Sequence, residues 1–116
     1  MDRIRIQERG GLLCASLSGR LAQAESEELL RTLSGQLAGR TGVLLDLSEV
    51  EYMSSSAVGA VVCLCQQVRL SGGRMAVAAP DERVHTLLEV AGLNQLLELR
   101  RTVEEAAAAI EGGPPA

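Results

Sequence analysis

The chain has 116 residues, a net charge of −4, no Trp or Phe, and Tyr52 as its only aromatic residue. This length suits a single domain that buries a core without metals or disulfides. The acidic balance gives no overall basic field to neutralise the phosphates of a nucleic acid, and one ring cannot form a stacking platform for bases. Direct nucleic acid binding is therefore not expected.

No apolar run approaches the roughly 20 residues that span a bilayer. The amino terminus leads into alternating polar sequence and lacks the apolar segment of a signal peptide. A cytoplasmic protein without membrane insertion is therefore expected. Cys14, Cys63 and Cys65 are expected to be buried free thiols, because the last two point about 200° apart around a helix and cannot chelate a metal from one face. No metal site and no cofactor are predicted.

The first 21 residues predict a β-hairpin. Ile4 and Ile6 alternate with polar residues, residues 8–11 have turn composition, and Leu13, Ala15 and Leu17 then alternate in a second strand. A helix is expected next, from about residue 25 to residue 38, with leucines at 29, 30, 33 and 37 on one face and Gly39 or Gly42 at its end. Gly35 lies inside this helix and weakens it by about 1 kcal/mol relative to alanine.

The central stretch begins with a short apolar run, Val43 to Leu47, typical of a strand that is buried on both faces. Residues 48–53 are expected to form a connection, and the serines at 54, 55 and 56 are suited to cap a helix. That helix should bury Val58, Val61, Val62 and Cys65, spaced at i, i+3, i+4 and i+7, and should stop at residues 72–73, which are both glycine.

The last third predicts two more strand and helix pairs. Residues 75–79 form a strand, and residues 81–91 a helix with Val84, Leu87, Leu88 and Ala91 on its apolar face and His85 on its solvent side. A strand at 96–99 follows. The spacing of Thr102 and Glu105 predicts a capping box before a final helix to about residue 110.

The predicted order is that of an α/β protein with a mixed, mostly parallel sheet, an N-terminal β-hairpin and about four helices. Residues 1–111 are expected to form one domain and residues 112–116 a flexible tail. No enzyme is predicted, since His85 is the only histidine and no base stands beside a serine nucleophile. Asp46 and Glu49 are explained by a strand end and a solvated loop.

The serines carry a resemblance to a known family. The stretch Ser54-Ser55-Ser56-Ala57 is similar to the Asp-Ser-Ser-Gly element of STAS domains in bacterial anti-sigma factor antagonists, whose first serine is phosphorylated by a partner kinase. The stretch 17–21 also resembles a turn of that family, and 91–93 the end of its penultimate helix, so that the similarity covers roughly residues 4 to 110. Ser54 and Ala22 stand where the family carries aspartate.

The resemblance implies a STAS fold, phosphorylation of Ser55, and a docking surface for an anti-sigma factor that is itself a serine kinase. This implied surface comprises Gly19, Arg20, Leu21, Ser54, Ser55, Ser56, Ala57, Val58 and Gly59. Two functions stay open. The chain is either a phosphorylation-switched anti-sigma factor antagonist or a constitutive STAS scaffold of a stressosome-like or transporter-associated assembly. A homodimer is one option for its assembly.

Overall fold

The computed structural model describes residues 4–37 and 40–111, so the tail expected at 112–116 lies outside the described residues. Five strands form one sheet in the order β1-β2-β3-β4-β5. Their bounds are Ile4–Arg9 (β1), Leu12–Leu21 (β2), Gly42–Met53 (β3), Arg74–Ala78 (β4) and Glu98–Arg100 (β5). The β1 and β2 strands pair antiparallel, and the other pairs are parallel. The mixed sheet with an N-terminal hairpin is confirmed.

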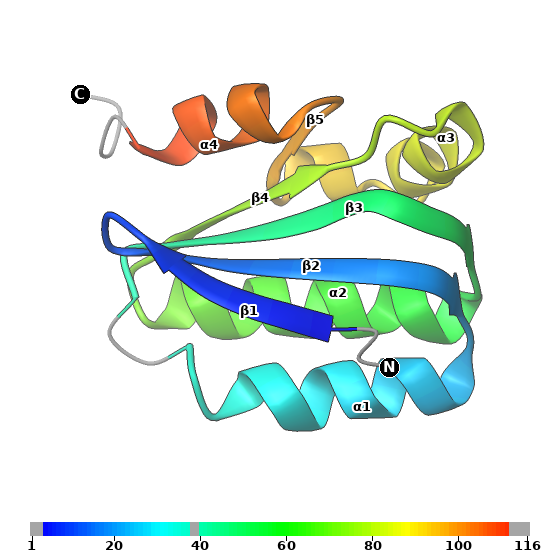
Figure 1. The fold of residues 1–116 in the computed structure, drawn as a ribbon, viewed down its shortest axis with the longest axis horizontal. Helices are drawn as coiled ribbons and strands as arrows, with labels where there is room; N and C mark the ends of the chain where they lie inside the picture. Colours follow the sequence, from blue (N-terminus) through cyan, green and yellow to red (C-terminus); the bar gives the residue numbers. More distant parts are fainter. Residues whose placement is uncertain (1–3, 38–39, 112–116) are drawn as a thin grey trace.

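Four helices cover the two faces of this sheet. They are α1 (Gln23–Ser34), α2 (Ser55–Leu70), α3 (Glu82–Val90) and α4 (Val103–Glu111), with a short 3-10 helix, η1 (Leu93–Gln95), before β5. The first three helices contribute to a large core on one face, and α4 packs on a smaller core on the other face. Figure 1 shows α1 and α2 on one side of the sheet and α4 on the opposite side.

The central strand is buried on both faces, as predicted. Val43 and Leu45 belong to the larger core, and Leu44 between them belongs to the smaller one. The side chains of all three are no more than 1% exposed. A strand placed between two helical layers must be apolar at consecutive positions, which explains why this run does not alternate.

β3 is longer than predicted. Residues 48–53, expected to be a connection, continue the strand and pair with the last residues of β2. Leu47, Val50 and Met53 are the buried positions of this half, three residues apart. The register shifts between Ser16 and Ser18 and between Gly19 and Arg20 interrupt the two-residue period there. A strand with such irregularities lacks the alternating pattern by which strands are recognised in sequence.

The end of α1 differs from the prediction, whereas the end of α2 does not. The α1 helix ends at Ser34 with Gly35 as its C-cap, so Gly35 terminates this helix instead of weakening its interior. Leu37 lies beyond the helix and still reaches the core at 1% exposure. The α2 helix ends as predicted, with Gly72 at φ +84°, and a Cβ on Gly73 would lie 2.6 Å from the Arg40 carbonyl oxygen. Only glycine therefore fits at that approach.

The buried face of α3 is rotated from the predicted one. Val84 and Leu88 are buried, but the third buried residue is His85, which was expected on the solvent side, while Leu87 is 38% exposed. His85 Nδ1 lies 3.3 Å from Glu89 Oε1. Val84 and Leu88, at positions i and i+4, can share a buried face with His85 on one side or with Leu87 on the other. Packing against η1 and the sheet decides that His85 is the one covered.

The buried face of α2 and the position of β5 also differ in part. In α2, Val61 and Cys65 are buried as predicted, whereas Val58 and Val62 are half-buried. The rest of the buried face is formed by Ala57, Ala60, Leu64 and Val68.

The last strand begins at Glu98 instead of residue 96, because residues 93–95 form η1. One half of the predicted capping box is present, a 3.1 Å hydrogen bond from the Glu105 backbone N–H to Thr102 Oγ1, and the Thr102 hydroxyl donates a 3.2 Å hydrogen bond to Glu105 Oε1.

Candidate partner-docking site

Two sequence segments predicted to share a surface meet at one edge of the sheet. β2 and β3 end side by side with Leu21 opposite Met53, and α1 and α2 begin directly after them (Figure 1). The Ser54 backbone N–H donates a 2.9 Å hydrogen bond to the Leu21 carbonyl oxygen. This bond ties the start of α2 to the end of β2, so the expected docking segments 19–21 and 54–59 lie next to each other.

The three serines at the start of α2 have different environments. Ser54 is the N-cap, and its hydroxyl oxygen accepts a 3.2 Å hydrogen bond from the Ala57 backbone N–H. Ser55 and Ser56 are exposed and begin the helix, and their hydroxyls make no hydrogen bond within the described chain. Capping therefore occupies one hydroxyl and leaves two accessible to another protein. An added anionic group at Ser55 would meet the positive end of the α2 dipole.

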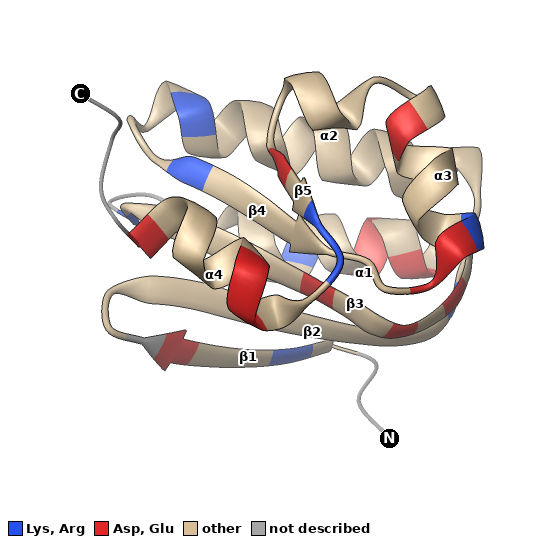
Figure 2. Cartoon of the chain, turned by 90° about the horizontal axis from the view of Figure 1, so that it is seen from above, with Lys and Arg blue, Asp and Glu red and all other residues tan. Residues whose placement is uncertain are grey.

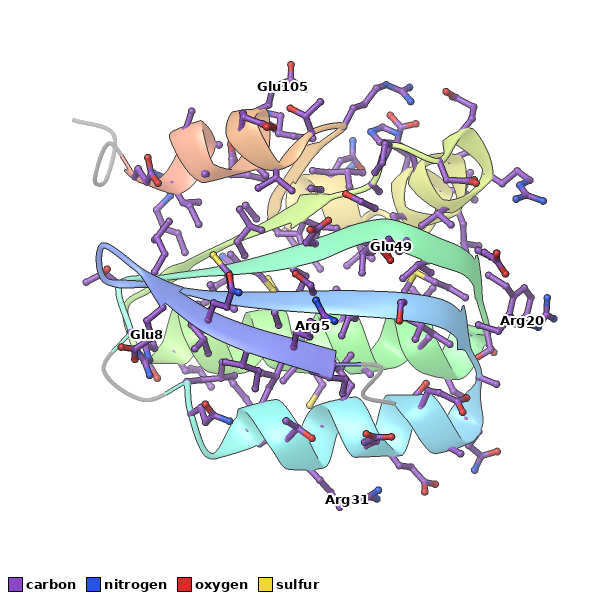
Figure 3. All side chains as sticks on the ribbon, in the orientation of Figure 1. Arg5, Glu8, Arg20, Arg31, Glu49 and Glu105 are labelled. Carbon is purple, nitrogen blue, oxygen red and sulfur yellow. The ribbon has the colours of Figure 1, made fainter. Side chains whose placement is uncertain are left out.

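Gly19 and Arg20 lie in the irregular last part of β2 and do not form the turn that the sequence suggested. Gly19 has φ +83°, a conformation that favours glycine, and the register shifts between it and Arg20. The Arg20 side chain is exposed and points away from the sheet (Figure 3). Its guanidinium carbon lies 4.4 Å from the centre of the Tyr52 ring.

Tyr52 is a surface residue that the sequence reasoning missed. It is 41% exposed and lies directly opposite Arg20 in the β2–β3 pairing. The signal that could have found it is its status as the only aromatic residue of the chain. Residues 48–53 were expected to form a connection, so the sequence did not predict that Tyr52 lies in a strand beside Arg20.

The structure separates the remaining expected residues into core and surface. The side chains of Leu21 and Ala57 are buried at 3% and 0% exposure, so they hold the site in place and leave contact with a partner to their neighbours. Val58 is half-buried and Gly59 is exposed. A Cβ on Gly59 would meet no atom within 4 Å, so the backbone of this turn is open to close approach.

The two positions at which the resemblance implies aspartate, 54 and 22, are the N-caps of two neighbouring helices. Ser54 caps α2 with its hydroxyl, whereas Ala22, at the N-cap of α1, has no side-chain acceptor. The Ala22 backbone N–H instead donates a 3.0 Å hydrogen bond to Glu25 Oε1. The negative charge at the start of α1 is therefore that of the Glu25 carboxylate, in the first turn of the helix.

The carboxylates and the histidine do not gather around the serines. Asp46 and Glu49 both lie within β3, and Asp46 Oδ1 accepts hydrogen bonds from the backbone N–H and the hydroxyl of Ser48. His85 is on α3, beside Glu89. Within residues 4–37 and 40–111, no group of three or more His, Cys, Asp or Glu side chains could hold a metal ion. None of the helices in these ranges is long and apolar enough to cross a membrane.

The cysteines are free thiols, but only two of them are buried. The Cys65 thiol donates a 3.4 Å hydrogen bond to the Leu96 carbonyl oxygen, and burial raises its pKa although the nearby Arg69 acts in the opposite direction. Cys14 lies in the smaller core. Cys63 is half-exposed, which corrects the expectation that all three thiols are buried.

Comparison with known proteins identifies relatives across nearly the whole chain. The candidate anti-sigma factor antagonist BtrV of Bordetella bronchiseptica is 29% identical over 116 residues, which cover 99% of this chain and 96% of BtrV. The anti-sigma F factor antagonist of Paenibacillus polymyxa is 26% identical over 99 residues, covering 84% of this chain and 85% of that protein.

Solved structures show the same fold. An anti-sigma factor antagonist (STAS) domain protein of Planctomyces limnophilus matches with a TM-score of 0.83 and 23% identity, over 95% of this chain and 98% of its own. The antagonist SpoIIAA in its unphosphorylated form matches with a TM-score of 0.74 and 17% identity, over 96% and 99%. The sequence model of the STAS domain matches residues 3–106. The chain therefore belongs to the STAS domain family.

Proposed function

We propose that this protein is an anti-sigma factor antagonist, which binds an anti-sigma factor and thereby releases a sigma factor. The observation that carries this proposal is the hydrogen bond from Ser54 to Leu21, which places the exposed Ser55 beside the end of β2. The names of the relatives support the same role. The protein would act by binding and not by catalysis, in the cytoplasm, where sigma factors work.

The proposed switch is phosphorylation of Ser55 by the anti-sigma factor, acting as a serine kinase. A phosphate there adds about −1.5 to −2 charges at the amino end of α2, where backbone N–H groups and the helix dipole stabilise it. The free protein would keep its fold. In a docked complex the same group loses water or faces the partner's surface, and an unpaired buried charge costs several kcal/mol. Phosphorylation would therefore weaken binding a hundredfold or more.

A second candidate is a constitutive STAS scaffold that uses the same surface without phosphorylation. The observation that favours it is the replacement of both family aspartates, by Ser54 at the N-cap of α2 and by Ala22 at the N-cap of α1. The two helix starts therefore carry no aspartate that a kinase could recognise.

The experiment combines phosphorylation with binding. The purified protein is incubated with ATP and the kinase encoded nearest to its gene, and the intact mass is measured for the unmodified protein and for Ser55→Ala and Ser56→Ala. One added phosphate that disappears only in Ser55→Ala supports the switch. No added phosphate, together with retained binding of the kinase, favours the scaffold.

Binding variants give the matching test. Ser55→Asp should keep a near-normal melting temperature and lose the partner, whereas Ser55→Ala should keep both. Ser54→Ala removes only a helix cap, worth about 0.5–2 kcal/mol of stability, and should affect binding less than Ser55→Asp. Gln66→Glu adds a charge on the exposed side of the same helix, three turns further on, and should leave binding unchanged. If Ser55→Asp binds as tightly as the unmodified protein, the switch is wrong.

A further inference from the structure

A small cavity lies at the opposite end of α2 from Ser55. Its volume is about 240 Å³, and its walls are the last turn of α2, the start of β4 and the segment from η1 to β5. α2 has 16 residues and is therefore about 24 Å long, so this cavity is separate from the docking surface. No part of the proposed antagonist function uses it.

The cavity exists because β5 is shorter than β4. β5 pairs only with Ala76–Ala78, so Arg74 and Met75 extend past it with no strand on that side. The chain before β5 arches over this gap as η1. Its two ends are anchored by Leu93 and Leu97, which are 0% and 6% exposed, and its middle by the hydrogen bond from the Cys65 thiol to the Leu96 carbonyl oxygen. The wall is therefore held in place by the core.

The side chains around the cavity are rich in hydrogen-bond donors. Arg69 and Arg74 enter its lining from α2 and β4, and Asn94 and Gln95 from η1. In Figure 2 the basic segment on the last turn of α2 lies beside the one at the start of β4. Across the described chain, the side chains of Arg69, Asn94 and Gln95 make no hydrogen bond or ion pair with another residue. These donors are therefore available to a ligand.

The only acidic residue of the lining, Glu98, is already engaged. Its Oε1 accepts a 2.9 Å hydrogen bond from Arg100 Nη2. Arg69 thus brings a positive charge beside a carboxylate that is already paired, in a chain whose net charge is −4. The lining offers cationic and amide donors with little unpaired negative charge to repel an anion.

We propose that this cavity is a binding site for the oxyanion group of a small molecule, either a phosphate or a carboxylate. Both groups accept paired hydrogen bonds from a planar guanidinium, and the two carboxamides can donate to the remaining oxygens. A volume of 240 Å³ lies below the roughly 300–1,000 Å³ of sites for drug-sized ligands, so the ligand is small. The site depends on neither a partner protein nor Ser55.

The test is a titration of the full-length protein followed by NMR spectra of its backbone amides, with inorganic phosphate in one arm and citrate in the other. Ionic strength is held constant with sodium chloride, because screening alone shifts exposed charges. Saturable shifts should appear at residues 69, 73–75 and 94–98. Saturation with phosphate alone identifies the phosphate class, and saturation with citrate alone identifies the carboxylate class.

Matched variants separate this site from general charge effects. Arg69→Gln should weaken binding on the order of tenfold, the loss expected for one charge-assisted hydrogen bond, and Gln95→Leu provides a second, uncharged change in the lining. Arg31→Gln removes an exposed arginine from the last turn of α1, outside the cavity, and should leave binding unchanged. The proposal is overturned if neither anion gives saturable shifts, or if Arg31→Gln weakens binding as much as Arg69→Gln does.

Discussion

The guanidinium of Arg20 stacks on the ring of Tyr52, with 4.4 Å between the guanidinium carbon and the ring centre. The two residues face each other across the β2–β3 pairing, just before the hydrogen bond that joins Leu21 to Ser54. The contact places the guanidinium over one face of the ring. Arginine and tyrosine are enriched among the residues that dominate binding energy at interfaces. Arg20 belongs to the proposed docking surface, and Tyr52 lies beside it.

The first prediction is that Tyr52→Ala lowers affinity for the anti-sigma factor by roughly tenfold or more. The ring contributes contact area and orients Arg20, and both are lost together. The free energy of unfolding should change by no more than about 1 kcal/mol, because the ring is partly exposed and a surface cation–π contact is weak. Leu70→Ala is the control, since Leu70 is 89% exposed at the far end of α2. Equal losses in the two variants would argue against a role for this pair.

The second prediction concerns the uncapped start of α1. Ala22 occupies an N-cap without a side-chain acceptor, with φ −102° and ψ −160°. Ala22→Ser supplies a hydroxyl that can accept from the backbone N–H groups of the first turn, and should raise the free energy of unfolding by about 0.5–2 kcal/mol in urea denaturation. Ala24→Ser places the same hydroxyl inside the helix and should be neutral or slightly destabilising. A larger gain from Ala24→Ser would contradict the assignment of the cap.

The third prediction tests which side of α3 faces the core. Leu88 is fully buried, so Leu88→Ala should lower the free energy of unfolding by about 2 to 5 kcal/mol through lost burial and a residual cavity. Val90 on the same helix is 82% exposed, and Val90→Ala should change stability by less than about 0.5 kcal/mol. Chemical denaturation measures both variants. Similar losses for the two would mean that α3 packs through another face.

The fourth prediction distinguishes the three thiols by their rates of labelling. Cys14 and Cys65 are buried, and the raised pKa of Cys65 disfavours the reactive thiolate. Cys63 is half-exposed and should be labelled first by a thiol reagent in the native protein, with the other two following only after denaturation. Mass spectrometry of peptides after timed labelling identifies each site. Labelling of Cys65 before Cys63 would contradict the described burial.

The sequence was sufficient for the features that depend on local pattern. The buried central strand follows from the consecutive apolar residues at 43–45. The start of α3 follows from Asp81, whose carboxylate accepts hydrogen bonds from the N–H groups of Arg83 and Val84. The start of α4 follows from Thr102 and Glu105. In each case the signal and its structural cause lie within one or two turns of chain. The resemblance to STAS domains added the docking segments and Ser55, which no periodicity marks.

Only the tertiary structure decided which residues share a surface and which flank of a helix is buried. The length of β3, the pairing of Arg20 with Tyr52 and the bond between Ser54 and Leu21 all require β2 and β3 to end together, although some thirty residues separate them in the chain. The burial of His85 in place of Leu87 likewise depends on where η1 and the sheet lie. Sequence periodicity specifies a stripe on one element, whereas the neighbouring elements decide which edge of that stripe is covered and which stays open to a partner.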